Sequence, residues 1–190
     1  MPVLTAEYAA GQMNLDLEKA GPAFESLVEA VNDYIESETG RKFDKAEHTE
    51  WHDMKGACGD LWVRNPPINS ITSLTDDANT DEITNRSNRA ITVTSCVEAH
   101  ADWLRLVNTE SVFAAGQSTA KIVYVGGYAQ DDMPRTLQMA AAWIAAAWWE
   151  GQERLTRQSQ NIDGQAIVWR PGVIPEEAQK VLNRYKLPLI

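Results

Sequence analysis

A long apolar segment between Met133 and Gly151 restricts this chain more than any other part of the sequence. It reads MPRTLQMAAAWIAAAWWEG and holds eleven consecutive apolar residues from Met139 to Trp149, chiefly alanine and tryptophan. Pro134 suits the start of a helix, and Gly151 suits its end. The segment is therefore predicted to be one helix with almost no polar face, whereas the surface helix of a monomer has one.

Two apolar stripes run along this predicted helix when successive residues are placed about 100° apart. The first stripe contains Leu137, Ala141, Ile144 and Trp148. The second contains Met139, Trp143, Ala146 and Ala147, with Trp149 between neighbours. Either the whole helix is buried in its own domain, or one stripe faces another protein. We expect the second, because one modest sheet cannot enclose the helix and tryptophan is enriched at interface hot spots.

The chain as a whole divides into three zones. Residues 1–45 and 131–190 favour helices, whereas short runs rich in β-branched and aromatic residues between 47 and 127 favour strands. With 190 residues and no internal repeat, residues 1–190 are predicted to form a single domain. The predicted fold class is α+β: a small helical bundle with a central antiparallel β insert.

Capping residues mark the predicted helices. Thr5 is expected to cap a short first helix. Pro22 begins a second helix whose apolar residues recur every three or four positions, and Gly40 ends it. Pro175 opens a final short helix. Residues 75–88 are polar and rich in turn formers, so they are expected to form an exposed loop or a weak hairpin.

The net charge of −10, from 27 acidic and 17 basic residues, limits the partners of the chain. An acidic surface repels the nucleic-acid backbone, so tight DNA binding through a basic patch is not expected, although DNA can pass such a surface without being held. The longest apolar run is shorter than the roughly twenty residues that span a bilayer. Residues 1–12 do not look like a secretory leader, so we expect a cytoplasmic product with no membrane partner.

The nearest approach to a metal-binding motif is EHTEWHD, which contains His48 and His52. Two histidines four residues apart share a zinc ion on a helix, but the glutamate of a zincin is replaced by Thr49. The segment leads into strands, where the two histidines stand about 13 Å apart on one face. We therefore expect a solvated polar strand, with no metal, no cofactor and no catalytic residue.

Four motifs occur together in one order: LVEAVNDYIESETGRKF, LWVRNPPINSITSL, AKIVYVGGYAQDDMPRTLQMAAAWIAAAWW and VIPEEAQKVLNRYK. This order resembles the head–tail connector proteins of tailed bacteriophages, also called adaptor or head-completion proteins, and their relatives in gene transfer agents. The matching points are TGR at 39–41, PINSI at 67–71, the pair Gly127 and Tyr128, and the closing leucine-and-tyrosine segment. The resemblance covers most of the chain.

The resemblance implies a structural virion protein and not an enzyme. In that family a ring of about a dozen copies docks under the portal and lengthens the DNA channel toward the tail. The implied partners are further copies of the chain, the portal protein and a tail or stopper protein, with DNA passing through but not specifically bound. The implied location is the virion neck, reached from the host cytoplasm during assembly.

Candidate interface residues lie on the apolar helix and in the C-terminal segment. On the helix they are Trp143, Trp148 and Trp149. In the C-terminal segment they are Arg170, Arg184, Tyr185 and Lys186. This segment either forms an arm that binds the portal or a neighbouring copy, or packs on its own domain. Two alternatives for the function remain open: a tail-completion or tail-terminator protein, and a metal-dependent hydrolase that uses the region of His48 and His52.

Overall fold

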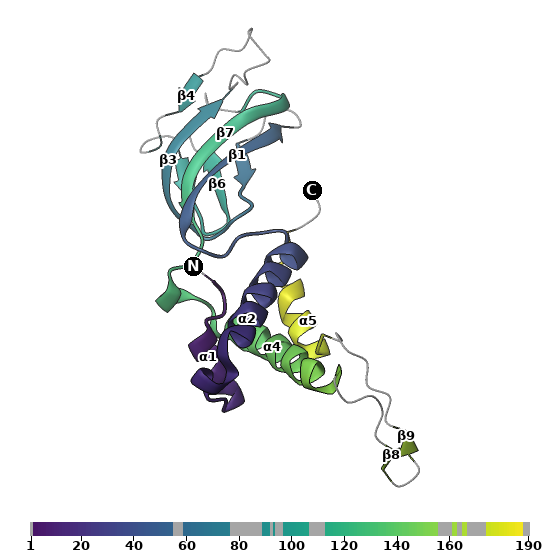
Figure 1. Ribbon diagram of the computed structural model, residues 1–190. Coiled ribbons are helices and arrows are strands. Elements are labelled where there is room, and N and C mark those ends of the chain that lie inside the picture. The colour runs from purple at the N-terminus through teal and green to yellow at the C-terminus, as the bar shows by residue number, and fades with distance from the viewer. Residues whose placement is uncertain are drawn as a thin grey trace. The chain divides into compact units, whose positions relative to one another are not determined.

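The computed structural model divides the chain into two compact units (Figure 1). The helical unit combines Met1–Arg41 with Gln130–Ile190, and the β unit is Lys42–Ala129. The described residues are 2–54, 59–76, 89–91, 93, 97–106, 113–155, 161–162, 165–166 and 174–187. The β unit is thus inserted between two parts of the helical unit, and the fold class is α+β as predicted.

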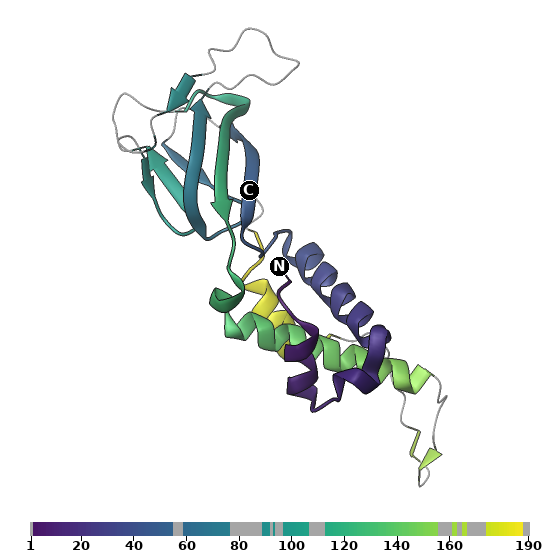
Figure 2. The ribbon, with the colours of Figure 1, turned by 60° about the vertical axis from the view of Figure 1, so that its left-hand side comes forward.

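In the described part of the helical unit, α4 contacts each of the other helices (Figures 1 and 2). The helices are α1 (Ala6–Met13), α2 (Leu17–Thr39), α4 (Arg135–Leu155) and α5 (Glu176–Asn183). A 3-10 turn, η1 (Gln130–Asp132), precedes α4, and a small hairpin of β8 (Asn161–Ile162) and β9 (Gln165–Ala166) follows it. The apolar helix of the sequence therefore lies at the centre of the packing in this unit.

Local capping explains where the N-terminal helices begin and end. The Thr5 side chain accepts a hydrogen bond from the Tyr8 backbone N–H, which confirms the predicted cap of α1. Gly21 has a positive φ of 65° that interrupts α2, so the regular helix starts at Pro22 as predicted, after a separate first turn. Gly40 ends α2 at a φ of 71°, a left-handed conformation that glycine adopts easily.

The predicted end of the apolar helix at Gly151 is wrong. α4 continues to Leu155, because a glycine inside a helix costs only about 1 kcal/mol and good helix formers follow it. At the other end, the Pro134 carbonyl accepts bonds from the backbone N–H groups of Leu137 and Gln138. Pro134 therefore stands just before the helix, where its missing N–H leaves no bond unmade.

Buried aliphatic, aromatic and alanine side chains form the core of the helical unit. On α2, α4 and α5 these are Phe24, Leu27, Val28, Val31, Ile35, Leu137, Ala140, Ala141, Ala142, Ile144, Ala145, Ala178 and Leu182. The alanines of α4 carry no long side chain, so the neighbouring helices can approach its backbone closely. Burial of this apolar surface is the main stabilising contribution, at about 25 cal/mol per Å².

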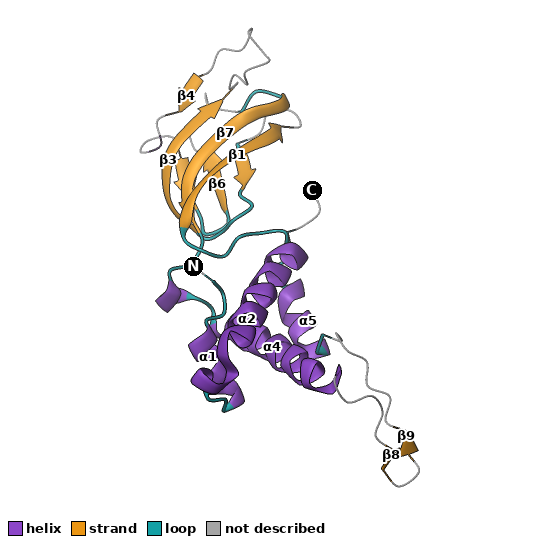
Figure 3. Ribbon diagram, in the orientation of Figure 1, coloured by secondary structure: helices purple, strands orange, loops and turns teal. Residues whose placement is uncertain are grey.

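The β unit contains two antiparallel sheets in its described part (Figure 3). The first has the order β1 (Ala46–Met54), β7 (Gly116–Gly126), β3 (Ile68–Asp76) and β4 (Arg89–Ile91). The second has the order β2 (Asp60–Trp62), β6 (Trp103–Leu106) and β5 (Val97–Ala99). The antiparallel insert is as predicted, but Thr75 and Asp76 belong to β3 and not to a loop. Residues 77–88 lie outside the described residues.

One hydrophobic core draws residues from both sheets of the β unit. Its buried members are Met54, Leu61, Val63, Leu74, Leu104, Leu106, Phe113, Ala120, Ile122 and Tyr124. Along β6 and most of β7, buried side chains alternate with more exposed ones. This alternation is expected where one face of an antiparallel sheet packs on a core and the other faces outward.

The segments through which the chain enters and leaves the β unit are bonded to each other. The Lys45 N–H donates to the Tyr128 carbonyl at 3.0 Å, and the Tyr128 N–H donates to the Phe43 carbonyl at 2.8 Å. Gly127 has a φ of 93°. A Cβ at this position would stand 2.2 Å from the Asp44 carbonyl oxygen, so the close approach of the two segments requires glycine.

Replacing Gly127 with alanine is expected to destabilise the protein by at least about 2 kcal/mol, because the methyl group collides with backbone and the positive φ is strained. Gly151→Ala is the matched control, because no heavy atom lies within 4 Å of its Cβ position and alanine is favoured in a helix by up to about 1 kcal/mol. Urea unfolding followed by circular dichroism measures both. If Gly127→Ala unfolds at the same urea concentration as the wild type, the predicted steric clash is contradicted.

Candidate interaction surface

Two of the three candidate tryptophans of α4 pack inside their own helical unit. The Trp149 ring meets the Phe24 ring edge-on, with centroids 5.2 Å apart and an interplanar angle of 89°. The Trp148 ring meets the Tyr34 ring at 5.6 Å and 65°. Both indoles are half-buried, and each edge-to-face pair contributes about 1 kcal/mol beyond the burial of its area. These two side chains therefore hold α4 on α2.

The third tryptophan lies on the outward face of α4. Trp143 is 40% exposed, and Met139, one turn before it, is 41% exposed. One turn after Trp143 the same face carries the half-buried Ala146 and Ala147. Tryptophan and methionine are enriched where proteins associate. We call Met139, Trp143, Ala146 and Ala147 the outer stripe of α4, which is the second stripe of the sequence analysis.

In the described residues, no helix combines the length and the hydropathy that crossing a membrane would need. The outer stripe of α4 lies opposite the side that packs on the other helices.

The C-terminal candidates fall at α5 and just beyond it. Lys186 pairs with Glu38 of α2 at 2.6 Å, and the Leu187 N–H donates to the Thr39 carbonyl at 3.3 Å. Hydrogen bonds from Lys186 and then from Gln179 lower the pKa of Glu38. This end of the chain packs on its own helical unit as far as residue 187.

The remaining C-terminal candidates differ in their exposure to solvent. Tyr185 is half-buried, and Arg184 is exposed at the end of α5. Arg170 lies outside the described residues. A role of these side chains in binding another protein stays a prediction.

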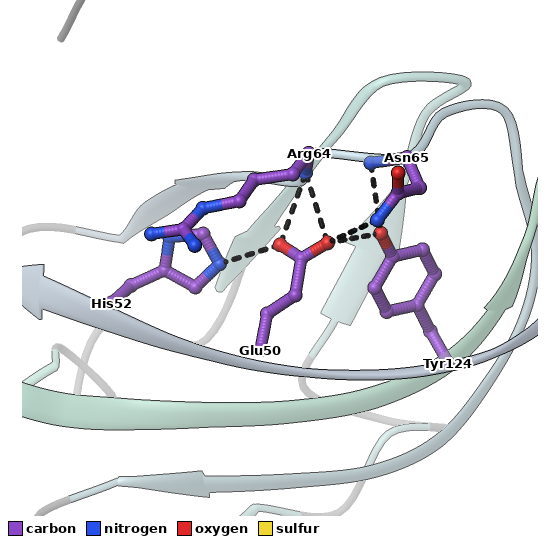
Figure 4. Close-up of polar contacts among 5 residues, drawn as sticks. All are labelled: Glu50, His52, Arg64, Asn65 and Tyr124. Carbon is purple, nitrogen blue, oxygen red and sulfur yellow. Dashed lines mark hydrogen bonds and ion pairs between the residues drawn. The ribbon is translucent and has the colours of Figure 1, made fainter. Parts of the chain in front are cut away.

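A buried carboxylate organises the polar part of the β unit (Figure 4). Glu50 of β1 is 6% exposed. It accepts hydrogen bonds from the Tyr124 hydroxyl at 2.5 Å, the Arg64 backbone N–H at 3.0 and 3.1 Å, and the Asn65 side-chain amide at 3.2 Å. His52 Nε2 lies 3.0 Å from the second carboxylate oxygen. Glu50 therefore joins β1 and β7 to the turn after β2.

Burial and hydrogen bonding together determine the charge state of Glu50. Burial raises the pKa of Glu50, but the hydrogen bonds from His52, Tyr124 and the Arg64 N–H outweigh burial, so the pKa lies below the usual glutamate range. Burial, followed by the hydrogen bond to Glu50, raises the pKa of Tyr124. Glu50 is ionised and Tyr124 is protonated near neutral pH, and both are used in holding the fold.

The expectation of a solvated polar strand for the segment EHTEWHD at 47–53 is correct for the strand and wrong for Glu50, which is buried. β1 is a strand, as predicted for the segment of His48 and His52. The His48 ring lies 5.6 Å from the Tyr124 ring, whereas His52 bonds Glu50. Sequence reasoning missed the role of Glu50, because its partners come from a turn and from a strand about seventy residues later. Among the described residues, no three His, Cys, Asp or Glu side chains are grouped to hold a metal ion.

The second sheet of the β unit carries an aromatic and ionic cluster that the sequence analysis did not identify. Trp62 is 49% exposed, and its ring lies 5.9 Å from the Trp103 ring. His100 stacks on Trp103 at 4.1 Å. The Arg105 guanidinium lies 4.8 Å from the same ring and pairs with Asp60 at 2.7 Å, which lowers the pKa of Asp60. Strand alternation places these side chains on the outward face.

Glu50 of the β unit is held by hydrogen bonds from its own fold, while α4 leaves the apolar side chains of Met139 and Trp143 exposed. These are features of a subunit that acts through contacts with other proteins. The family model of head completion proteins matches residues 3–187, and the chain belongs to the head completion protein family. This membership confirms the resemblance drawn from the sequence, and it makes the chain a head–tail connector component of a virion.

Solved structures of gene transfer agent particles share the fold. A chain in the neck of an empty particle, computed with C6 symmetry, has a TM-score of 0.53 and 14% identity over 88% of this chain and 79% of that one. A chain in the neck of a native particle, computed with C12 symmetry, has a TM-score of 0.54 and 13% identity, over 89% of this chain and 84% of that one. A chain in the virion of the native particle has a TM-score of 0.54 and 17% identity, over 100% of this chain and 91% of that one. None of the curated proteins compared with the chain matches it.

Glu50→Gln is expected to cost about 1–3 kcal/mol near neutral pH, because it leaves buried donors without a charged acceptor. Since the folded-state pKa of Glu50 is lowered, its stabilising contribution is complete above the unfolded value of about 4.3 and is lost as pH falls through the folded value. The stability difference from wild type should therefore shrink below about pH 4.

The matched control for this pH dependence is Glu47→Gln, an exposed glutamate on the same strand. It should change stability by less than about 0.5 kcal/mol at any pH. Urea unfolding between pH 7 and pH 3 measures the difference for both variants. A constant difference for Glu50→Gln across this range contradicts the assigned charge state.

Proposed function

We propose that the protein forms a ring in the virion neck that docks on the portal and extends the DNA channel toward the tail. The observation that carries the proposal is the outer stripe of α4, with Met139 and Trp143 exposed on a helix whose opposite side is buried. A ring of identical subunits needs such an adhesive surface on every copy. The necks that share the fold are described with C6 and C12 symmetry, which supports a ring here.

The acidic charge of the chain supports a conduit that does not hold DNA. With 27 acidic and 17 basic residues, a ring of many copies carries a large negative charge. Such a ring repels the phosphate backbone, so DNA slides through the channel without specific contacts. DNA is accordingly a passing cargo, and the binding partners are the portal on one side and a tail or stopper protein on the other.

We propose further that the protein has no catalytic activity. His52 is bonded to the buried Glu50, and Glu50 already accepts several hydrogen bonds from the fold. A metal-dependent hydrolase would require these side chains to leave their structural partners. The arrangement therefore supports a structural use of the only sequence segment that resembles a metal site.

Elemental analysis of the purified protein tests the hydrolase alternative. We expect no stoichiometric zinc, and we expect His52→Ala to lower stability without changing the metal content. Thr49→Ala, an exposed change on the same strand, is the control for handling and metal contamination. Zinc at one ion per chain that disappears in His52→Ala would instead support the hydrolase.

Co-assembly with the cognate portal ring tests the connector proposal directly. We expect negative-stain images of the mixture to show an added ring under the portal. Binding to tail tubes, with none to the portal, would support a tail-completion or tail-terminator protein. Absence of binding to either partner, together with absence of rings of the protein itself, would overturn the proposal.

Trp143→Ala is expected to weaken ring formation by about 2 kcal/mol per subunit contact, roughly thirty-fold, because the exposed indole is the largest apolar group on the outer stripe. The folded subunit should keep its stability. Trp62→Ala is the matched control, since this side chain is at least as exposed but lies in the β unit. Sedimentation or portal co-assembly measures both variants, and equal assembly of Trp143→Ala and wild type contradicts the role of the outer stripe.

A further inference from the structure

The outward face of the second sheet of the β unit carries two parallel rows of side chains that have no role in the proposed ring. Each row is made by residues that lie opposite one another on β2, β6 and β5. The first row is ionic and contains Asp60, Arg105 and Glu98. The second row is aromatic and contains Trp62, Trp103 and His100. We call these six side chains the aromatic platform.

Contacts within the aromatic platform fix the orientation of its central ring. His100 stacks on Trp103 with ring centroids 4.1 Å apart and an interplanar angle of 12°. The Arg105 guanidinium lies 4.8 Å from the centroid of the same ring, and two hydrogen bonds of 2.7 and 3.1 Å hold it on Asp60. Because these side chains are already held in place, a ligand that binds here costs little additional conformational entropy.

Trp62 is the ring that the aromatic platform presents to solvent. It is 49% exposed, more than any other large apolar side chain among the described residues. Its ring centroid lies 5.9 Å from that of Trp103, and the two rings are tilted by 33°. A single exposed apolar side chain needs no explanation by itself. The position of this indole, beside a fixed ring and an ionic row, is what indicates a ligand.

The aromatic platform also has hydrogen-bonding groups that its own contacts leave unused. In the described part of the chain, the indole N–H groups of Trp62 and Trp103 make no hydrogen bond. The two bonds from Arg105 to Asp60 use only part of the guanidinium, which has five N–H donors. One oxygen of Glu98 lies 3.4 Å from a ring nitrogen of its neighbour in the aromatic row, and the other oxygen can accept. Donors and acceptors therefore lie side by side next to an exposed aromatic face.

A pyranose sugar combines the features that such a surface recognises. One face of the sugar ring consists of C–H groups, which are attracted to the negative face of an indole. Each hydroxyl group at the rim of the ring can both donate and accept a hydrogen bond. A purely apolar partner would instead bury the polar groups of the platform without partners, which is costly. Nucleic-acid bases also stack on aromatic rings, but their phosphates would meet the carboxylates of Asp60 and Glu98.

We propose that the aromatic platform binds a neutral polysaccharide, with one pyranose ring stacked on Trp62 and its hydroxyl groups bonded to Arg105 and Glu98. The site lies wholly within the β unit, so it does not depend on the proposed ring. A single sugar on an exposed surface is bound weakly, but many copies of the site in one assembly act together. A virion component with this site adds attachment to a saccharide-coated surface to its role as a connector.

Affinity electrophoresis of the full chain tests this proposal. Native gels are cast with a mixed-linkage β-glucan, a galactomannan or soluble starch, and a gel without polysaccharide is the reference. We expect at least one of these neutral polysaccharides to slow the wild-type chain. Trp62→Ala should weaken this binding by at least about tenfold, because it removes the ring on which the sugar stacks. Unchanged migration of the wild-type chain in all of the polysaccharide gels would overturn the proposal.

Further variants separate ring stacking from a general loss of structure. Trp62→Tyr should keep most of the binding, whereas Trp62→Leu, which is apolar but has no aromatic face, should lose it as Trp62→Ala does. Trp143→Ala is the matched control, because that indole is 40% exposed but lies on α4 in the helical unit, and it should bind as the wild type does. Urea unfolding of each variant shows whether the fold is kept. Wild-type binding by Trp62→Leu would overturn the stacked geometry.

Glu98→Ala gives a second test that leaves the aromatic row unchanged. Glu98 is exposed on the short strand β5, so its removal should leave the stability of the fold close to that of the wild type. Loss of its hydrogen bond to the sugar should weaken polysaccharide binding by at least about threefold. Equal binding by Glu98→Ala and the wild type would contradict the assigned role of the ionic row.

Two other outcomes would assign the aromatic platform to a different partner and overturn the proposal. The first is binding of oligothymidine that is lost in Trp62→Ala, because it would indicate a platform for stacked bases. The second is loss of co-assembly with the portal or the tail in Trp62→Ala, without polysaccharide binding by the wild type, because it would indicate a protein interface. If the wild-type chain binds polysaccharide but forms no ring, alone or on the portal, only the proposed function is contradicted.

Discussion

The contact between α2 and α4 is the interaction on which the rest of the helical unit depends. The rings of Trp148 and Trp149 pack edge-on against Tyr34 and Phe24, and this fixes the rotation of α4 about its own axis. With that rotation fixed, one side of an almost wholly apolar helix is buried and the other side presents Trp143. The same residue type therefore serves two purposes on one helix, internal packing and an exposed surface.

In the β unit, the edge strand β1 brings a charged side chain, Glu50, into a buried position. An ionised glutamate without partners would be very costly there, and Glu50 is tolerated because it accepts hydrogen bonds from backbone and side chains of the turn after β2 and of β7. The carboxylate thereby specifies how the turn after β2 sits on the sheet. This arrangement gives the insert a defined shape at the position where the chain enters and leaves it.

Much of the fold was predictable, because local rules determine it. Thr5, Pro22 and Gly40 mark helix ends through capping and backbone geometry, and those rules act within a few residues. Glu50 was not predictable, since its burial depends on partners that only the folded chain brings near. For the candidate surface, the two stripes of α4 were visible in the sequence, but the choice of which stripe is buried depends on the rings of α2. The end of α4 was misplaced because a single glycine is a weak stop when helix formers follow it.

The discontinuous helical unit has a consequence for synthesis on the ribosome. Its first part, Met1–Arg41, emerges early, but α4 and α5 follow only after the whole β unit has been made. At translation rates of about 5–20 residues per second, the apolar side of α2 waits for several seconds without its packing partner. During this interval the apolar face of α2 is exposed to solvent, whereas the β unit that follows it in the chain can already bury its own hydrophobic core. Chaperone capture of that helix, or its early pairing with a neighbouring nascent chain, would act in this window.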